Sequence, residues 1–164
     1  MPLIARVPRD HSIHEFRAAA GLRYWEARRL AIAGDRLAAI YLWGYTAEML
    51  LKAAYFRLRG WLPTQSITLV DLQNAKSYAI SGLHLSWNSN LHDLSRWREL
   101  LVEQRKQQLV PYPWAFARGF NARVTRIYLN WREHLRYRTN RPYQGEVART
   151  YQAVTWLLGQ YRHL

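Results

Sequence analysis

The sequence contains no cysteine, which removes several classes of chemistry at once. Disulfide bonds, thiolate-ligated metal sites and cysteine nucleophiles are all excluded. The glycines are scattered, and neither a Gly-x-Ser-x-Gly turn nor a glycine-rich nucleotide loop occurs. His11 and His14 lie close together, but no His or carboxylate pair elsewhere combines a helical ligand spacing with a third ligand. The sequence therefore predicts neither a metal site nor a cofactor.

Long apolar runs are missing as well. Arginines interrupt every segment with a helical pattern, so no run approaches the length of a membrane span. The N-terminal residues MPLIARVPRD have neither a long apolar core nor a small-residue cleavage pattern, which argues against secretion. We therefore predict a cytoplasmic protein that does not enter a membrane.

Acidic residues and lysines are scarce, whereas arginine is abundant. The chain has 11 Asp and Glu against 24 Lys and Arg, a net charge of +13, and its only lysines are Lys52, Lys76 and Lys106. Arginine is always charged, and its planar fork of N–H donors suits phosphates and carboxylates. The composition favours an anionic partner such as nucleic acid or a nucleotide. Genome composition and solubility explain an arginine-rich chain equally well.

Hydrophobic and aromatic residues are plentiful enough for a folded core. They make up 49% and 14% of the 164 residues, respectively. A chain of this length and composition folds by default as one domain. We predict an N-terminal arm over residues 1–11 and a single helical domain over residues 12–164.

Helical periodicity dominates this domain, and no alternating strand pattern competes with it over more than a few residues. We expect five main helices, with starts marked by Ser12, Asp35, Asn90, Pro113 and Glu146. The fourth is expected to run to about Arg138. Thr68 and Asp71 have the spacing of a capping box, which indicates a short helix over residues 69–79. The predicted fold class is all-α: an up-and-down bundle of about five main helices, with a loop or short-helix crossover between the second and third.

The predicted helix from Asp35 to Arg59 carries a carboxylate in the middle of its apolar face. Glu48 lies there between Gly44, which would allow close helix packing, and Leu51. A buried carboxylate without a partner is strongly unfavourable unless it takes up a proton. We therefore expect Glu48 to meet an arginine or His134 from the fourth helix, with Lys52 as an outer partner. The pair would either fix helix register or support binding.

The region from Pro111 to Leu164 carries nine Arg against Glu133 and Glu146. Arg and His together can hold a phosphate and move a proton, as metal-independent RNA cleavage requires. Rings near the arginines can stack on unpaired bases. A solvated basic helix whose rings belong to the core is the alternative. The candidate catalytic residues are His134, Arg126 and Arg138. The candidates for anion or nucleic-acid binding are Arg123, Arg132, Arg136, Tyr137 and Arg141.

Three patterns, in this order, resemble the HEPN family (higher eukaryote and prokaryote nucleotide-binding). A Gly-Asp start followed by Tyr41-Leu42-x-Gly44-Tyr45-x-x-Glu48-x-x-Leu51-Lys52-Ala53 is similar to the family's second-helix signature. Leu91-His92-Asp93-Leu94 is similar to the motif that opens its third helix. Its C-terminal pattern is matched by Trp131, then Arg136-Tyr137, a break and a final amphipathic helix.

The resemblance implies an up-and-down helical bundle, a homodimer, and partnership with a minimal nucleotidyltransferase in a toxin–antitoxin system. It also implies the family's ribonuclease mark, an Arg and a His with four to six residues between them. Here seven residues separate Arg126 from His134. We therefore predict a non-catalytic HEPN-like module that binds RNA, a nucleotide or a partner protein. The alternative is a metal-independent ribonuclease that uses His134 with Arg126 or Arg138. Supporting structural roles are assigned to Glu48, Lys52, His92 and Asp93.

Overall fold

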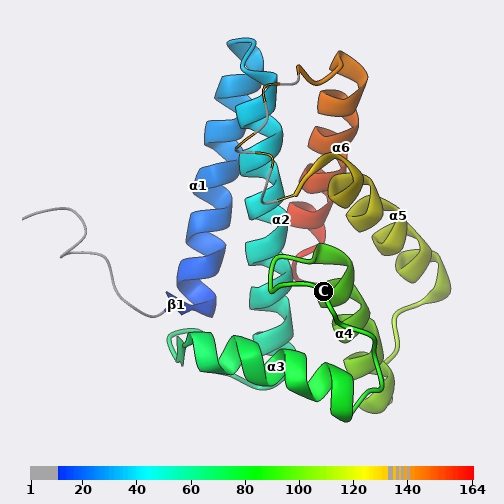
Figure 1. Ribbon diagram of the computed structural model, residues 1–164. Coiled ribbons are helices and arrows are strands. Elements are labelled where there is room, and N and C mark those ends of the chain that lie inside the picture. Colours follow the sequence, from blue (N-terminus) through cyan, green and yellow to red (C-terminus); the bar gives the residue numbers. More distant parts are fainter. Residues whose placement is uncertain (1–10, 133–134, 136, 138, 140) are drawn as a thin grey trace, which may run out of the picture.

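The computed structural model describes residues 11–132, 135, 137, 139 and 141–164, and within them it is an all-α bundle of six helices. The helices are α1 (Ile13–Ile32), α2 (Arg36–Leu58), α3 (Leu69–Ser81), α4 (Leu94–Gln107), α5 (Trp114–Asn130) and α6 (Gln144–Gln160). In Figure 1, α1 and α2 stand side by side, α6 lies on the far side of α2, and α3 crosses the end of the bundle. The predicted fold class is confirmed.

Helix α2 is the centre of the bundle. It contacts α1, α4, α5 and α6, and the residues buried along it do not lie on a single face. This pattern is typical of a helix surrounded by others rather than one that faces solvent on one side. Its neighbours contribute large buried rings to the shared core, including Trp87, Trp97 and Trp131. The charged cluster around Glu48 is built on this helix.

Local sequence signals decide where the first three helices begin. At the start of α1, the Ser12 side chain accepts a hydrogen bond from the backbone N–H of Glu15. At the start of α2, the Asp35 side chain accepts one from the backbone N–H of Ala38. Thr68 and Asp71 form both hydrogen bonds of the predicted capping box at the start of α3. Gly34, with a φ of +89°, joins α1 to α2 in a left-handed conformation that glycine adopts without strain. The predicted starts of these helices are confirmed.

The start of α4 corrects one prediction. Asp93 is the N-cap in place of Asn90, because its Oδ1 accepts hydrogen bonds from the backbone N–H groups of Ser95 and Arg96 at 3.0 and 3.2 Å. Asn90 lies one turn earlier and accepts from the backbone N–H of His92 at 3.0 Å. A carboxylate can bond two free amides and also interact favourably with the positive end of the helix dipole, which explains the preference for Asp93.

The helix expected to reach Arg138 is shorter than predicted. α5 ends at Asn130, and Trp131 is extended, with φ −127° and ψ 135°. The turn of the chain brings the Trp131 side chain into the core, where it is completely buried. A helix that continued to Arg138 would place Arg126 and Tyr137 on one side. Because α5 ends at Asn130, helical spacing does not relate these two residues. His134 lies outside the described residues.

A short strand pairing was not predicted. β1 (His11–Ser12) runs antiparallel to β2 (Ser66–Ile67), with His11 opposite Ile67 and Ser12 opposite Ser66. It connects the chain before α1 to the loop between α2 and α3. Strands of two residues are too short to produce an alternating pattern in the sequence.

Trp131 packs directly on the backbone of α2 at Gly44. A Cβ atom at position 44 would lie 2.1 Å from atoms of the indole ring, far inside van der Waals contact. The ring of Tyr45 meets the same indole edge to face, at a centroid distance of 5.4 Å. The prediction that Gly44 allows close packing is confirmed, and the group that approaches it is the Trp131 side chain.

We expect Gly44→Ala to lower the free energy of unfolding by about 1–3 kcal/mol, the usual cost of overpacking a core. The added methyl group forces the buried indole of Trp131 to move. Denaturant titration followed by circular dichroism measures the change. Gly21→Ala is the matched control, because Gly21 lies inside α1 with no atom within 4 Å of its Cβ position. The control should raise stability by about 0.5–1 kcal/mol. Equal effects of the two substitutions would contradict the packing role.

Candidate functional site

Glu48 is the centre of a buried charged cluster on α2. The residue is 4% exposed, and its Oε1 accepts a hydrogen bond from Lys52 Nζ, one turn further along the helix, at 2.5 Å. His92, from the loop before α4, brings its Nδ1 to 2.9 Å from Oε2. Lys52 is 5% exposed, and its ammonium group also lies 5.6 Å from the centroid of the Trp97 ring. The cluster thus links α2 to the start of α4.

These contacts identify two partners of Glu48 that differ from the expected arginine of the fourth helix, while the other expected partner, His134, lies outside the described residues. Among the described residues, Lys52 and His92 contact the carboxylate, and no arginine of α5 does so. Lys52 is a direct, buried partner rather than an outer one. His92 reaches Glu48 because the Asn90–Asp93 turn places its imidazole against α2, a long-range contact that sequence spacing does not reveal.

The pKa of Glu48 reflects competition between burial and its two partners. Burial raises the pKa of this carboxyl, but the hydrogen bond from His92 and the positive charge of Lys52 together outweigh burial and hold the pKa below its ordinary value. Glu48 is therefore ionised at neutral pH, and Lys52 is its counter-charge. A carboxylate in this position fixes the orientation of the His92 ring.

Aromatic rings flank the side of the cluster that reaches solvent. Tyr45 packs edge to face against His92 at a centroid distance of 6.3 Å and against Trp131 at 5.4 Å. Tyr41 packs on Tyr45 in the same way at 4.9 Å. The His92 side chain is 39% exposed, so the cluster reaches the surface through its imidazole. The rings hold the imidazole in place and leave the carboxylate buried.

Asp93 has a different role from its neighbour His92. Besides capping α4, it accepts a hydrogen bond from the Ser89 hydroxyl at 2.6 Å. Burial and, next, the negative charge of Asp93 raise the pKa of Tyr128 on α5 to about 12, which keeps that hydroxyl protonated. The guanidinium carbon of Arg132 lies 3.3 Å from the centroid of the Tyr128 ring. Asp93 therefore joins the start of α4 to the end of α5.

Arginines on and just after α5 form a second feature, which we call the α5 arginine surface: Arg118, Arg123, Arg126 and Arg132. The sequence from 111 to 132 contains no acidic residue. Within the described part of the chain, none of the four guanidinium groups forms an ion pair with a carboxylate. Their positive charge is therefore not neutralised by any carboxylate of the described residues.

Rings support several of these arginines. Arg118 lies 5.4 Å from the ring centroid of Trp114, its neighbour one turn earlier on α5. Arg123 lies 4.6 Å from that of Trp156 on α6. Such cation–π contacts position a guanidinium group without removing its charge. Trp114 and Trp156 were not among the residues predicted from the sequence, although the four-residue spacing from Trp114 to Arg118 indicates a contact on one helix face.

The structure brings only part of the predicted binding set together. Arg123 and Arg132 belong to the α5 arginine surface, as does the catalytic candidate Arg126. Arg141 instead lines a hollow beside the turn between α1 and α2. Tyr137 is 71% exposed. The remaining candidates, His134, Arg136 and Arg138, lie outside the described residues. Ribonuclease activity therefore stays a prediction.

Comparisons with known proteins do not identify a family. No family model, curated protein or solved structure matches the chain. In the described ranges, no group of three or more His, Asp or Glu side chains is arranged to hold a metal ion. None of the helices described there is long and apolar enough to cross a membrane. The resemblance to HEPN proteins stays a prediction, and function is argued from geometry.

A double-mutant cycle tests the buried pair. Glu48→Leu or Lys52→Met alone should each cost about 3–5 kcal/mol of the free energy of unfolding, because each removes the buried counter-charge of the other residue. The double variant should cost clearly less than the sum, since it removes both charges. Denaturant titrations measure all four proteins. As a control, Glu103→Gln, in a surface pair with Lys106, should change stability by no more than about 0.5 kcal/mol. Additive costs would contradict direct coupling.

Glu48 should also shape the pH dependence of stability. Because folding lowers its pKa, its stabilising contribution is complete above the ordinary value of 4.5 and is lost as pH falls through the lower, folded value. The free energy of unfolding should therefore decrease on acidification, and the decrease should be smaller in Glu48→Gln. Urea titrations across the acid range measure both curves. Parallel curves would show that Glu48 does not contribute.

Proposed function

We propose that the protein is a non-catalytic binding module for single-stranded RNA, which it contacts through the α5 arginine surface. The observation that carries the proposal is a helix without acidic residues whose arginines have no carboxylate partner within the described residues. Figure 1 shows α5 on the outer side of the bundle, next to α4 and α6. An extended polyanion has access to such a helix.

Some arginines elsewhere in the described part of the chain form ion pairs with carboxylates. On α1, Arg23 pairs with Glu26. On α4, Glu99 lies 2.6 Å from Arg96 and 2.9 Å from Arg98. Among the described residues, no carboxylate pairs with the α5 arginine surface, and the phosphates of an RNA backbone can supply the counter-charges. Neutralising phosphates releases counterions, which is the main driving force for binding nucleic acids at low salt.

Exposed rings next to the arginines favour single strands over duplexes. Trp114 is 73% exposed at the start of α5, with Arg118 beside it. Unpaired bases stack on such rings, whereas the bases of a duplex are already stacked on each other. Phosphate contacts by arginine and base stacking on Trp114 together support RNA as the ligand.

The HEPN resemblance adds two parts to this proposal: a homodimer, and a nucleotidyltransferase-type partner in a toxin–antitoxin pair in the cytoplasm. RNA binding by the α5 arginine surface requires neither of them. Light scattering measures the oligomeric state directly. The predicted partnership is tested by co-expressing the protein with a nucleotidyltransferase encoded by a neighbouring gene and asking whether the two proteins co-purify.

Arg118→Ala combined with Arg126→Ala should weaken binding of a fluorescein-labelled single-stranded RNA at low salt. Both side chains are exposed, so folding should be unaffected. The slope of log affinity against log salt concentration should fall by roughly 0.7 for each arginine that contacts a phosphate. Fluorescence anisotropy over a range of salt concentrations measures both quantities.

The matched control removes the same charge from another helix. Arg23→Ala combined with Arg29→Ala lowers the net charge equally but acts on α1, where both side chains are exposed. The control should leave the salt slope close to that of the wild-type protein. If both double variants lost RNA affinity equally, net charge alone would explain the effect, and a defined binding surface on α5 would be contradicted. Tighter binding of duplex than of single-stranded RNA would contradict the stacking role of Trp114.

A further inference from the structure

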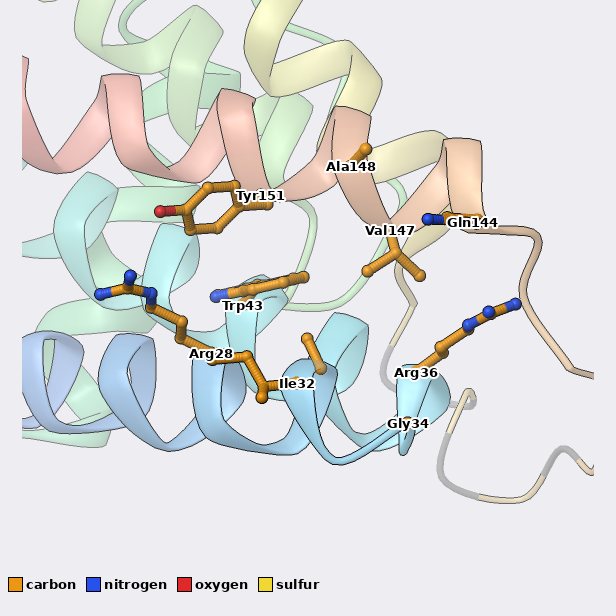
Figure 2. Close-up of a pocket in the computed structure, with 10 residues that line it drawn as sticks. Arg28, Ile32, Gly34, Arg36, Trp43, Gln144, Val147, Ala148 and Tyr151 are labelled. Carbon is orange, nitrogen blue, oxygen red and sulfur yellow. The ribbon is translucent and has the colours of Figure 1, made fainter.

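A hollow between α1, α2 and α6 differs in character from the α5 arginine surface. Its volume is about 540 Å³, within the range of roughly 300–1,000 Å³ typical of small-molecule sites. Most of its wall is apolar, with Ile32 from α1, Trp43 from α2, and Val147 and Tyr151 from α6 (Figure 2). No residue of α5 lines it. The hollow is therefore separate from the proposed RNA surface.

The polar groups of the hollow are cations and an amide. Arg28 lies near the hydroxyl end of Tyr151, and Arg36 lies with Gln144 at the opposite end (Figure 2). Both arginines are exposed, and in the described part of the chain neither is paired with a carboxylate. Arg28 also lies 5.2 Å from the centroid of the Trp25 ring, a contact that holds it beside the hollow. The charge of the hollow therefore favours an anion.

Trp43 provides an independent sign of a ligand. Its side chain is 1% exposed, and its indole Nε1 has no hydrogen-bond partner within the described residues. Buried donors are almost always paired, because an unpaired donor loses its bond to water without compensation. Figure 2 shows this nitrogen at the end of the indole directed toward Arg28, with the ring of Tyr151 above it in the view. A small displacement of the Tyr151 ring would open it to an acceptor in the hollow.

We propose that this hollow binds a small aromatic anion, that is, a flat ring that carries a carboxylate or a phosphate. The ring packs between Tyr151 and Val147, next to the indole of Trp43. The acidic group bonds to Arg28 or Arg36, which suit planar carboxylates and phosphates through paired N–H donors. Failure of RNA binding would leave this proposal intact, because the α5 arginine surface contributes nothing to the hollow.

Matched charged and neutral probes test the ligand class. Adenosine monophosphate is compared with adenosine, and naphthoate with its neutral amide, by isothermal titration calorimetry. In at least one pair, the charged member should bind about tenfold or more tightly than the neutral one, as a hydrogen bond to a charged group predicts. Tighter binding of adenosine monophosphate than of adenosine identifies a phosphate ligand. Tighter binding of naphthoate than of its amide identifies a carboxylate ligand. Equal affinities within both pairs would overturn the proposal.

Variants locate the binding in the hollow. Arg28→Ala with Arg36→Ala should reduce the affinity of the charged probe to that of its neutral analogue. Arg29→Ala is the matched control, because Arg29 is the exposed neighbour of Arg28 on α1 but does not line the hollow. Ala148→Phe fills the hollow from an exposed position and should abolish binding of the charged probe without unfolding the protein. Unchanged affinity in these variants would place the binding elsewhere and overturn the proposal.

The indole of Trp43 reports on binding directly. In a proton–nitrogen NMR spectrum of protein labelled at tryptophan, the indole signal lost in Trp43→Phe identifies this residue among the eight tryptophans. Addition of the tighter charged probe should shift that signal strongly. Trp87 and Trp97 do not line the hollow, so they serve as internal references. A probe that shifts the reference signals as much as that of Trp43 would contradict binding in the hollow.

Discussion

The buried carboxylate of Glu48 is the constraint on which the centre of this molecule depends. A charge in this position is tolerated only with compensating partners, and Lys52 and His92 provide them from two different segments. Lys52 comes with α2 itself, and its ammonium group also faces the Trp97 ring of α4. His92 belongs to the turn that opens α4, and its bond to Glu48 fixes where α4 begins to pack on α2. Next to it, Asp93 caps α4 and lies close to Tyr128 of α5. One charge requirement therefore positions three helices.

The contact between Trp131 and Gly44 sets the end of α5 and so shapes the surface around it. A large ring needs a surface without a Cβ atom to approach a helix backbone this closely, and Gly44 provides it. The chain leaves the helical conformation at Trp131 to make the contact. Arg132 then stacks on Tyr128, at the edge of the solvent-exposed arginines of α5. A packing requirement inside the core thus determines where a group of surface charges ends.

Two arginine-lined features of the molecule differ in how they surround a ligand. The arginines of α5 stand on an outer helix with exposed rings, an arrangement suited to an extended, flexible polyanion. Arg28 and Arg36 border an apolar hollow, which suits a compact ligand with one ring and one acidic group. Both features carry arginines, four on the α5 arginine surface and two beside the hollow. Enclosure by Trp43, Val147 and Tyr151, rather than charge, distinguishes the ligands they can accept.

The sequence alone determined the features that depend on neighbouring residues: the helical class, the caps at Ser12, Asp35 and Thr68, the short helix α3, and the need of Glu48 for a cationic partner. Only tertiary structure decided that this partner includes His92, that α5 ends at Asn130, and that Trp43 and Tyr151 meet beside Arg28. Caps and periodicity act within a few residues and can be read from spacing. A partner 44 positions away, or a ring that leaves its helix to cover a glycine, is selected by which surfaces meet when the helices pack. That selection depends on the three-dimensional shape of the whole bundle and leaves no local signal in the sequence.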